Sequence, residues 1–168
     1  MSDAYFLPSK IFLPVLKISG ELGAAGAADM PLVSRWIENF YRETLHTEPP
    51  DLTPRAANKQ LSASPESRSK REMIPGATES AVALFVWRDV RPVAMGMLSD
   101  EEHPAAGAVC RMNLIYVAPE FRAKGYGRAI VTALAQKSRE RGRVPLLYVA
   151  RENTAAIQLY ESLGWRHL

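Results

Sequence analysis

The sequence contains a single cysteine, Cys110, so no disulfide bond can form within the chain. Small secreted domains usually depend on several disulfide bonds, and this class is therefore a poor match. The chain also lacks any apolar run of the roughly 20 residues that a membrane-spanning helix needs. We therefore expect a protein of the reducing cytoplasm that has no membrane partner.

Strong charge of either sign is also missing. Lys and Arg number 21 and Asp and Glu number 18, which gives a net charge of +3. Nucleic-acid binding needs a basic stripe together with a recognition motif, so we expect no nucleic-acid partner. Hydrophobic residues (47%) and charged residues (23%) have the proportions of an ordinary globular protein. At about 150 residues per domain, a chain of 168 residues predicts one domain with its own core.

The N-terminal half is the less regular one. Its apolar stretch at residues 11–18 is interrupted by Pro14 and Lys17, so we interpret residues 15–19 as an edge strand rather than as part of a signal peptide. A helix is predicted after Asp29 and Pro31, because an apolar stripe at the helical period follows: Leu32, Val33, Trp36, Ile37, Phe40, Tyr41 and Leu45. Residues 47–80 are rich in proline and polar side chains, which predicts a mobile connection with at most a short helix at 54–61.

The C-terminal half alternates strands and helices. Residues 81–87 and 93–98 are apolar and are separated by a short turn, which predicts an antiparallel hairpin. A polar loop at 100–107, a strand at 108–117, a helix at 125–141, a strand at 145–149 and a helix at 153–163 follow. A strand–helix–strand unit implies two parallel strands joined by a right-handed crossover. The predicted fold class is therefore a mixed α/β sheet.

The junction between the third strand and its helix carries two glycines, Gly125 and Gly127. The first N–H groups of a helix lack partners inside the helix, and glycines allow a ligand to come close to them. Such a turn binds phosphate or pyrophosphate, and basic side chains surround it here. A dinucleotide fingerprint would need a small residue where Ile130 stands, and the chain has no nucleotide P-loop sequence. A tight turn with a solvated basic helix is the structural alternative.

A second segment, residues 153–165, decides between these readings. It contains Asn153, Ala156, the pair Leu159-Tyr160 and the pair Gly164-Trp165. Together with the Arg122-x-x-Gly125-x-Gly127 turn and the preceding Val117-x-Pro119, this segment resembles the GNAT superfamily of acyl-CoA-dependent N-acyltransferases. The specific resemblance covers residues 108–168.

The resemblance implies a central mixed sheet with helices on both faces, in which a bulge splays the two parallel strands apart. Acetyl-CoA would be the cosubstrate, without a metal. Pantetheine would lie in the gap against the backbone of Ile115, Tyr116 and Val117, and Asn153 would reach its arm. The pyrophosphate would bind at the turn, which consists of Arg122, Ala123, Lys124, Gly125, Tyr126, Gly127 and Arg128. Tyr160 would lie near the thioester sulfur and act as the general acid for the leaving thiolate.

The implied reaction is transfer of an acetyl group to a primary amine on a small molecule or peptide. We name no general base: the strand at 108–117 offers only Arg111 and Asn113, and Arg111 could instead recognise an acidic group of the substrate. We interpret four other side chains as surface residues: Glu43 on the first predicted helix, and Glu101, Glu102 and His103 in the predicted loop before this strand. A CoA-binding module without catalysis therefore stays open as the alternative.

The C-terminus also departs from the resemblance. Members of the superfamily usually have a final hairpin after the Gly-aromatic pair, whereas this chain ends at Leu168. Part of the wall on the acceptor side is therefore expected to be short, missing or supplied by a second subunit, as in a homodimer.

Overall fold

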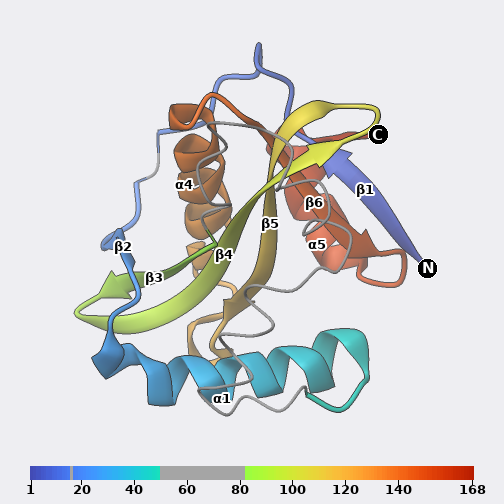
Figure 1. The fold of residues 1–168 in the computed structure, drawn as a ribbon. Coiled ribbons are helices and arrows are strands. Elements are labelled where there is room, and N and C mark those ends of the chain that lie inside the picture. Colours follow the sequence, from blue (N-terminus) through green and yellow to red (C-terminus); the bar gives the residue numbers. More distant parts are fainter. Residues whose placement is uncertain (16, 50–81) are drawn as a thin grey trace, which may run out of the picture.

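The computed structural model describes residues 1–15, 17–49 and 82–168, and these form one mixed sheet flanked by helices (Figure 1). Over the described residues, the strand order is β2-β3-β4-β5-β6-β1-β7. The strands are β1 (Ser2–Phe6), β2 (Glu21–Ala24), β3 (Ala83–Asp89), β4 (Arg91–His103), β5 (Gly107–Val117), β6 (Val144–Ala150) and β7 (Arg166–His167). The helices are α1 (Met30–Phe40), α4 (Tyr126–Glu140) and α5 (Thr154–Ser162), with short turns η1 (Ala27–Asp29), η2 (Tyr41–Leu45) and η3 (Pro119–Phe121).

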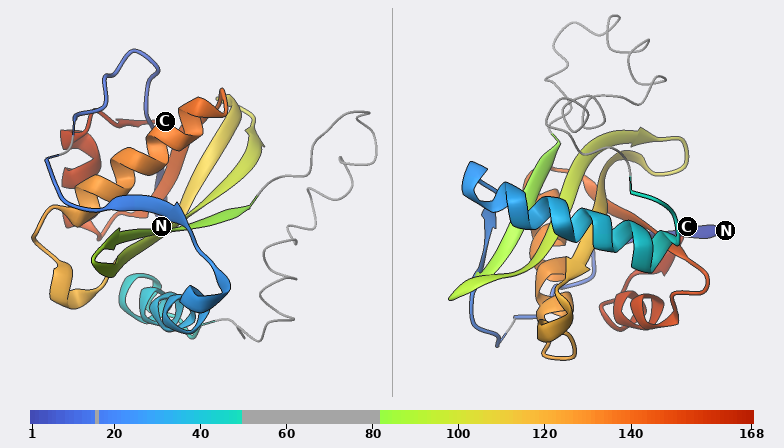
Figure 2. Two further views of the ribbon diagram at one scale, coloured as in Figure 1. Left: turned by 90° about the vertical axis from the view of Figure 1, so that its left-hand side faces the viewer. Right: turned by 90° about the horizontal axis from the view of Figure 1, so that it is seen from below.

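Helices cover both faces of the sheet, as expected. The left-hand view of Figure 2 shows α4 on one side of the strands and α1 on the other. Ile130 and Leu134 of α4 belong to the larger apolar cluster, whereas Trp36 of α1 packs in a second cluster with Tyr116. At Gly96 of β4, a Cβ atom would lie 2.4 Å from Leu134 Cδ1, so the missing side chain lets α4 approach the sheet.

The C-terminal half follows the predicted order of elements. β3 and β4 form the antiparallel hairpin, and β5 and β6 are the parallel pair joined through α4. The predicted polar loop at 100–107 is wrong, because β4 continues to His103 and β5 begins at Gly107. Acidic side chains on this extension pair with arginines at the end of α4, as Asp100 does with Arg141 at 3.3 Å. Because these ion pairs balance the charges of the acidic side chains, the polar residues 100–103 can continue the strand.

The predicted edge strand at residues 15–19 is wrong, since the structure has β1 and β2 on either side of it. Phe12 and Val15 are almost fully exposed, at 96% and 93%. Ile11, Leu13 and Ile18 do pack against the larger apolar cluster, so part of the segment is anchored as irregular chain rather than as a strand. The predicted helix at 54–61 and the rest of the connection up to residue 81 lie outside the described residues.

The edge of the sheet beyond β6 is completed by the other end of the chain. β1 pairs antiparallel with β6 from Ser2 opposite Ala150 to Phe6 opposite Leu146, and β7 pairs with the far side of β1. A side-chain ion pair between Arg151 and Asp3, at 2.8 Å, joins the end of β6 to β1. The N-terminal strand therefore covers an edge of β6 that would otherwise be open. No helix in the described part is long and apolar enough to cross a membrane.

Candidate cofactor and active site

The parallel strands β5 and β6 separate before they end. Their ladder runs only from Val109 opposite Val144 to Met112 opposite Leu147. Beyond it, Leu114 has a positive φ of 50°, and the pairing of β5 with β4 shifts register between Met95 and Met97. This bulge turns β5 away from β6. The splayed strand pair expected from the resemblance is confirmed.

The bulge leaves backbone groups of β5 facing the gap. The amide of Ala118 donates to the carbonyl of Val93 at 3.0 Å, so Ala118 faces β4. Because successive residues of a strand point their backbone groups to opposite sides, Val117 faces the open side. Its carbonyl accepts a hydrogen bond from Arg122 Nε at 3.0 Å. A protein side chain thus already contacts one of the three backbone positions predicted for pantetheine.

Glu43, in the turn that follows α1, contacts Tyr116 and Arg122. Its carboxylate accepts hydrogen bonds from Tyr116 Oη at 3.2 Å and from Arg122 Nη2 at 2.7 Å. The Arg122 guanidinium also lies 5.3 Å from the centre of the Tyr116 ring. Glu43 is half-exposed, so both carboxylate oxygens keep lone pairs for a further donor.

Glu43 was interpreted as a surface residue, and the sequence does carry a signal for its position. It lies seven positions after Trp36, which places the two on one helix face after two turns. Trp36 packs against Tyr116, with ring centroids 6.2 Å apart. The π-turn at Tyr41–Leu45 extends α1 far enough to bring Glu43 beside the same tyrosine.

The turn between β5 and α4 presents a row of unused amides. Among the described residues, none of the backbone N–H groups of residues 123–128 makes a hydrogen bond of good geometry. Gly125 has a φ of +92°, a conformation that favours glycine, and it directs the chain into the first turn of α4. The amide of Arg122 is different, because it donates to the carbonyl of Pro119 at 3.3 Å. The predicted pyrophosphate turn therefore offers free donors at six of its seven positions.

The side chains of the turn hold it in place. Tyr126 Oη donates to Asp89 Oδ2, which also accepts from Ser19 Oγ at 2.7 Å. These two hydrogen bonds, with that of Tyr126 the stronger influence, lower the pKa of Asp89. Lys124 Nζ donates to the carbonyl of Glu120 at 3.0 Å. The start of α4 is therefore anchored to the end of β3 while its amides stay free.

Arg128 and Asn153 act at opposite ends of α5. Arg128 Nη2 donates to Ser162 Oγ at 2.8 Å. Asn153 Oδ1 accepts the amide of Ala156 at 3.2 Å and so caps α5. Its amide nitrogen stays available, so the predicted contact with the pantetheine arm remains a prediction alongside the capping role.

Replacing Asn153 with alanine is expected to lower the free energy of unfolding by about 1 kcal/mol, because the N-cap of α5 loses its acceptor. Urea unfolding of the purified variant would measure this loss. Asn153→Asp keeps a capping oxygen and serves as the matched control. Equal stability of the alanine variant and the native chain would contradict a capping role.

Tyr160 lies on α5 and is only 8% exposed. Its ring packs against that of Trp165, with centroids 5.9 Å apart. No partner of its hydroxyl appears among the described residues, and burial raises its pKa to about 12. The phenol is therefore held in its protonated form at neutral pH, as a proton donor requires.

Stability is expected to fall as the pH rises above about 9. Burial raises the pKa of Tyr160 to about 12 and that of Cys110 to about 11, from 10.0 and 9.0. In this range the unfolded chain releases protons that the folded chain keeps, so the unfolded state gains stability. Each group would remove about 2–3 kcal/mol once the pH passes its folded pKa. Urea unfolding at a series of pH values measures the loss, and Cys110→Ala should make it smaller.

The acidic residues before β5, interpreted as surface residues, lie far from the open end of the gap. Glu101 and Glu102 pair with Val109 and Ala108, about eight residues or roughly 26 Å along the strand from Val117. Arg111 stacks on Tyr148 at 4.9 Å and lies 3.8 Å from Glu101. These side chains contact one another rather than the open end of the gap.

Comparison with known proteins agrees with this geometry. Residues 35–165 match the model of the Acetyltransferase (GNAT) family. Over 82 residues the chain is 39% identical to a mycothiol acetyltransferase of Thermobispora bispora, a match that covers 48% of this chain and 25% of that protein. The chain thus spans about a quarter of the length of this curated relative.

Solved structures show the same fold. A putative GNAT acetyltransferase of Novosphingobium aromaticivorans aligns with a TM-score of 0.59 and 22% identity, over 100% of this chain and 61% of that one. A "predicted acetyltransferase with acetyl-CoA" from Clostridium acetobutylicum aligns with a TM-score of 0.60 and 12% identity, over 88% and 90%. The family match extends over most of the chain and includes the free-amide turn, the splayed strands and α5. The chain belongs to the GNAT acetyltransferase family.

Proposed function

We propose that the protein transfers the acetyl group of acetyl-CoA to a primary amine of a small molecule or peptide. The row of free N–H groups at residues 123–128, beside the splayed end of β5, carries this proposal. Unpaired amides at a helix N-terminus bind phosphate groups well, because each donates a hydrogen bond and the helix dipole adds positive potential.

The residues of the gap fit the rest of the cosubstrate. Ile115 and Val117 would pair with pantetheine through their backbone, with Tyr116 between them in the ladder to β4. Asn153 would donate its free amide N–H groups to the same arm. Acetyl-CoA would supply the activated acyl carbon, and the chain would orient it toward the open end of the gap.

Tyr160 would supply the proton that the departing thiolate needs. Its hydroxyl has no competing partner among the described residues, and its raised pKa keeps it protonated. A positioned acid of this kind typically contributes a factor of about 10²–10⁴ to the rate.

Glu43 would receive the incoming amine in its charged form. Arg122 puts a positive charge at this end of β5, so a cationic acceptor needs a carboxylate there. Glu43 presents one between Tyr116 and Arg122. Its remaining lone pairs would accept the ammonium before the proton is lost to solvent.

Replacing Glu43 with glutamine is expected to raise KM for the amine about 10-fold or more, because a hydrogen bond to a charged group is lost. The affinity for acetyl-CoA should stay within about twofold, which isothermal titration would show. Glu38→Gln on the same helix is the matched control. An unchanged KM across a panel of cationic amines would remove Glu43 from the acceptor site.

Two measurements test the function itself. Titration calorimetry with acetyl-CoA measures binding, and release of CoA thiol in the presence of a panel of primary amines measures transfer. Saturable binding with transfer to at least one amine supports the proposal. Binding without transfer to any amine would support the CoA-binding module, for which the unassigned general base is the specific argument. Absence of binding would overturn both.

A further inference from the structure

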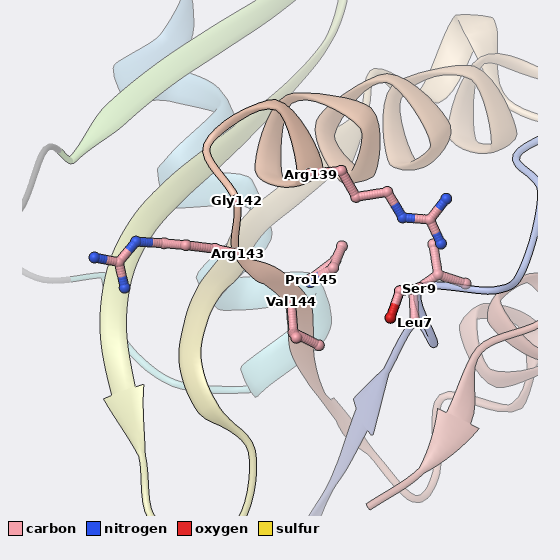
Figure 3. A pocket seen from close by; sticks show the side chains of 7 residues that line it. All are labelled: Leu7, Ser9, Arg139, Gly142, Arg143, Val144 and Pro145. Atoms are coloured by element: carbon pink, nitrogen blue, oxygen red, sulfur yellow. The ribbon is translucent and has the colours of Figure 1, made fainter.

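A second cavity, of about 330 Å³, lies where α4 ends and β6 begins (Figure 3). The 15 residues of α4 place it about 22 Å from the free amides at the start of that helix. Leu7, Val144 and Pro145 form its apolar lining, and its polar members are Ser9, Arg139 and Arg143. The cavity is separate from the site described above, and its volume suits a small organic molecule.

Arg139 has donors that the protein does not use. Its Nη2 donates to the carbonyl of Pro8 at 2.7 Å. Its Nε is buried and has no acceptor, and no carboxylate lies within ion-pair distance among the described residues. Burial also lowers the pKa of Arg139, which reflects the loss of water around its charge. The side chain as a whole is only partly buried, so the group that lacks a partner is the Nε–H donor together with a charge that no carboxylate of the described residues balances.

The two neighbouring arginines, in contrast to Arg139, form ion pairs with acidic side chains. Arg141 contacts Asp100 at 3.3 Å, and Arg143 contacts Asp100 at 3.5 Å and Glu102 at 3.4 Å. Figure 3 shows Arg143 pointing away from the cavity toward the neighbouring strand, whereas Arg139 extends over the cavity toward Ser9. Among the described residues, Arg141 and Arg143 at this end of α4 thus have acidic partners, whereas Arg139 has none.

The position of Arg139 in the last turn of α4 gives it some stabilisation from the helix dipole. That interaction acts on the charge as a whole and leaves the Nε–H group without an acceptor. An oxyanion in the cavity would balance the charge through the terminal Nη groups, because a guanidinium binds a carboxylate through two parallel hydrogen bonds.

We infer that this cavity binds a small carboxylic acid, with its carboxylate on Arg139 and its apolar body against Leu7, Val144 and Pro145. Ser9 lines the same cavity, and a rotation of its side chain would offer a hydroxyl donor to the second carboxylate oxygen (Figure 3). The inference does not depend on acetyl transfer, since none of these residues belongs to the cosubstrate site.

Butyrate is a suitable probe, and the Nε–H resonance of Arg139 in a ¹H–¹⁵N NMR spectrum reports a change of charge at the same guanidinium. Loss of one signal in Arg139→Gln assigns the resonance. Titration of the native protein with butyrate should shift it saturably, with a dissociation constant of about 1–10 mM for a ligand of this size. Butanol, which has the same apolar body without the charge, should leave it unshifted.

Arg143→Gln is the matched control, because it removes a lining arginine whose charge is already paired. It should keep the butyrate response of the Arg139 signal. Inorganic phosphate tests whether the head group alone suffices, and a response to phosphate equal to that of butyrate would overturn the role of the apolar lining. No saturable shift of the Arg139 signal with butyrate, or equal shifts of all arginine signals, would overturn the site.

Discussion

Replacing Tyr160 with phenylalanine is expected to lower kcat for acetyl transfer by about 10²–10⁴-fold, the usual contribution of a positioned general acid. The change removes one hydroxyl that has no partner among the described residues, so packing against Trp165 should persist. Binding of acetyl-CoA, measured by calorimetry, should therefore stay within about twofold. The dependence of kcat on pH supplies a second readout: with a Tyr160 pKa of about 12, activity should not decline between pH 8 and 10.

Tyr5→Phe is the matched control for this substitution. Tyr5 is equally buried, at 6% exposed, but lies on β1 and stacks on His167. Its loss of a hydroxyl should leave turnover nearly unchanged. A Tyr160→Phe enzyme with native kcat and a native pH profile would show that the leaving thiolate takes its proton from elsewhere.

Reversing the charge of Arg128, as in Arg128→Glu, is expected to weaken acetyl-CoA binding about 10- to 100-fold, since a hydrogen-bonding cation near the diphosphate becomes an anion. Folding should respond in the opposite sense. An acidic residue in the first turn of a helix gains about 0.3–1 kcal/mol from the helix dipole, which offsets loss of the contact with Ser162. Calorimetry and urea unfolding of the same variant measure the two effects separately.

Lys137→Glu provides the comparison, because it makes the same change of net charge in the last turn of α4. Its affinity for acetyl-CoA should match that of the native chain. Equal weakening by both substitutions would mean that overall charge matters rather than the turn. Unchanged binding in Arg128→Glu would contradict the assignment of the pyrophosphate to residues 122–128.

The C-terminal half of the fold could be predicted because its signals are local. The glycines at 125 and 127, the apolar period of α4 and the cap at Asn153 each mark an element within a few residues. The splayed strands could be predicted only from the family resemblance, because the bulge at Leu114 contains no glycine that would indicate it in the sequence.

The N-terminal half could not be predicted in the same way, because its partners are distant. Residues 11–18 look more like a strand than Ser2–Phe6 does, yet Phe12 and Val15 are exposed while Tyr5 is buried. The free edge of β6 determines which N-terminal segment forms a strand, and no local sequence pattern describes that edge. Glu43 is a similar case: its seven-residue spacing from Trp36 is visible, but its contacts with Tyr116 and Arg122 depend on how α1 crosses the sheet.

The position of β1 between β6 and β7 also affects how the chain is made. Asp3 and its partner Arg151 are 148 residues apart, so at about 5–20 residues per second the ribosome needs roughly 7–30 s to synthesise the intervening segment. During that time the first strand has no neighbour, and its unpaired N–H and C=O groups can pair with another nascent chain. Slowing translation late in the message should therefore increase co-translational aggregation, whereas binding of a chaperone to the emerging N-terminus should suppress it.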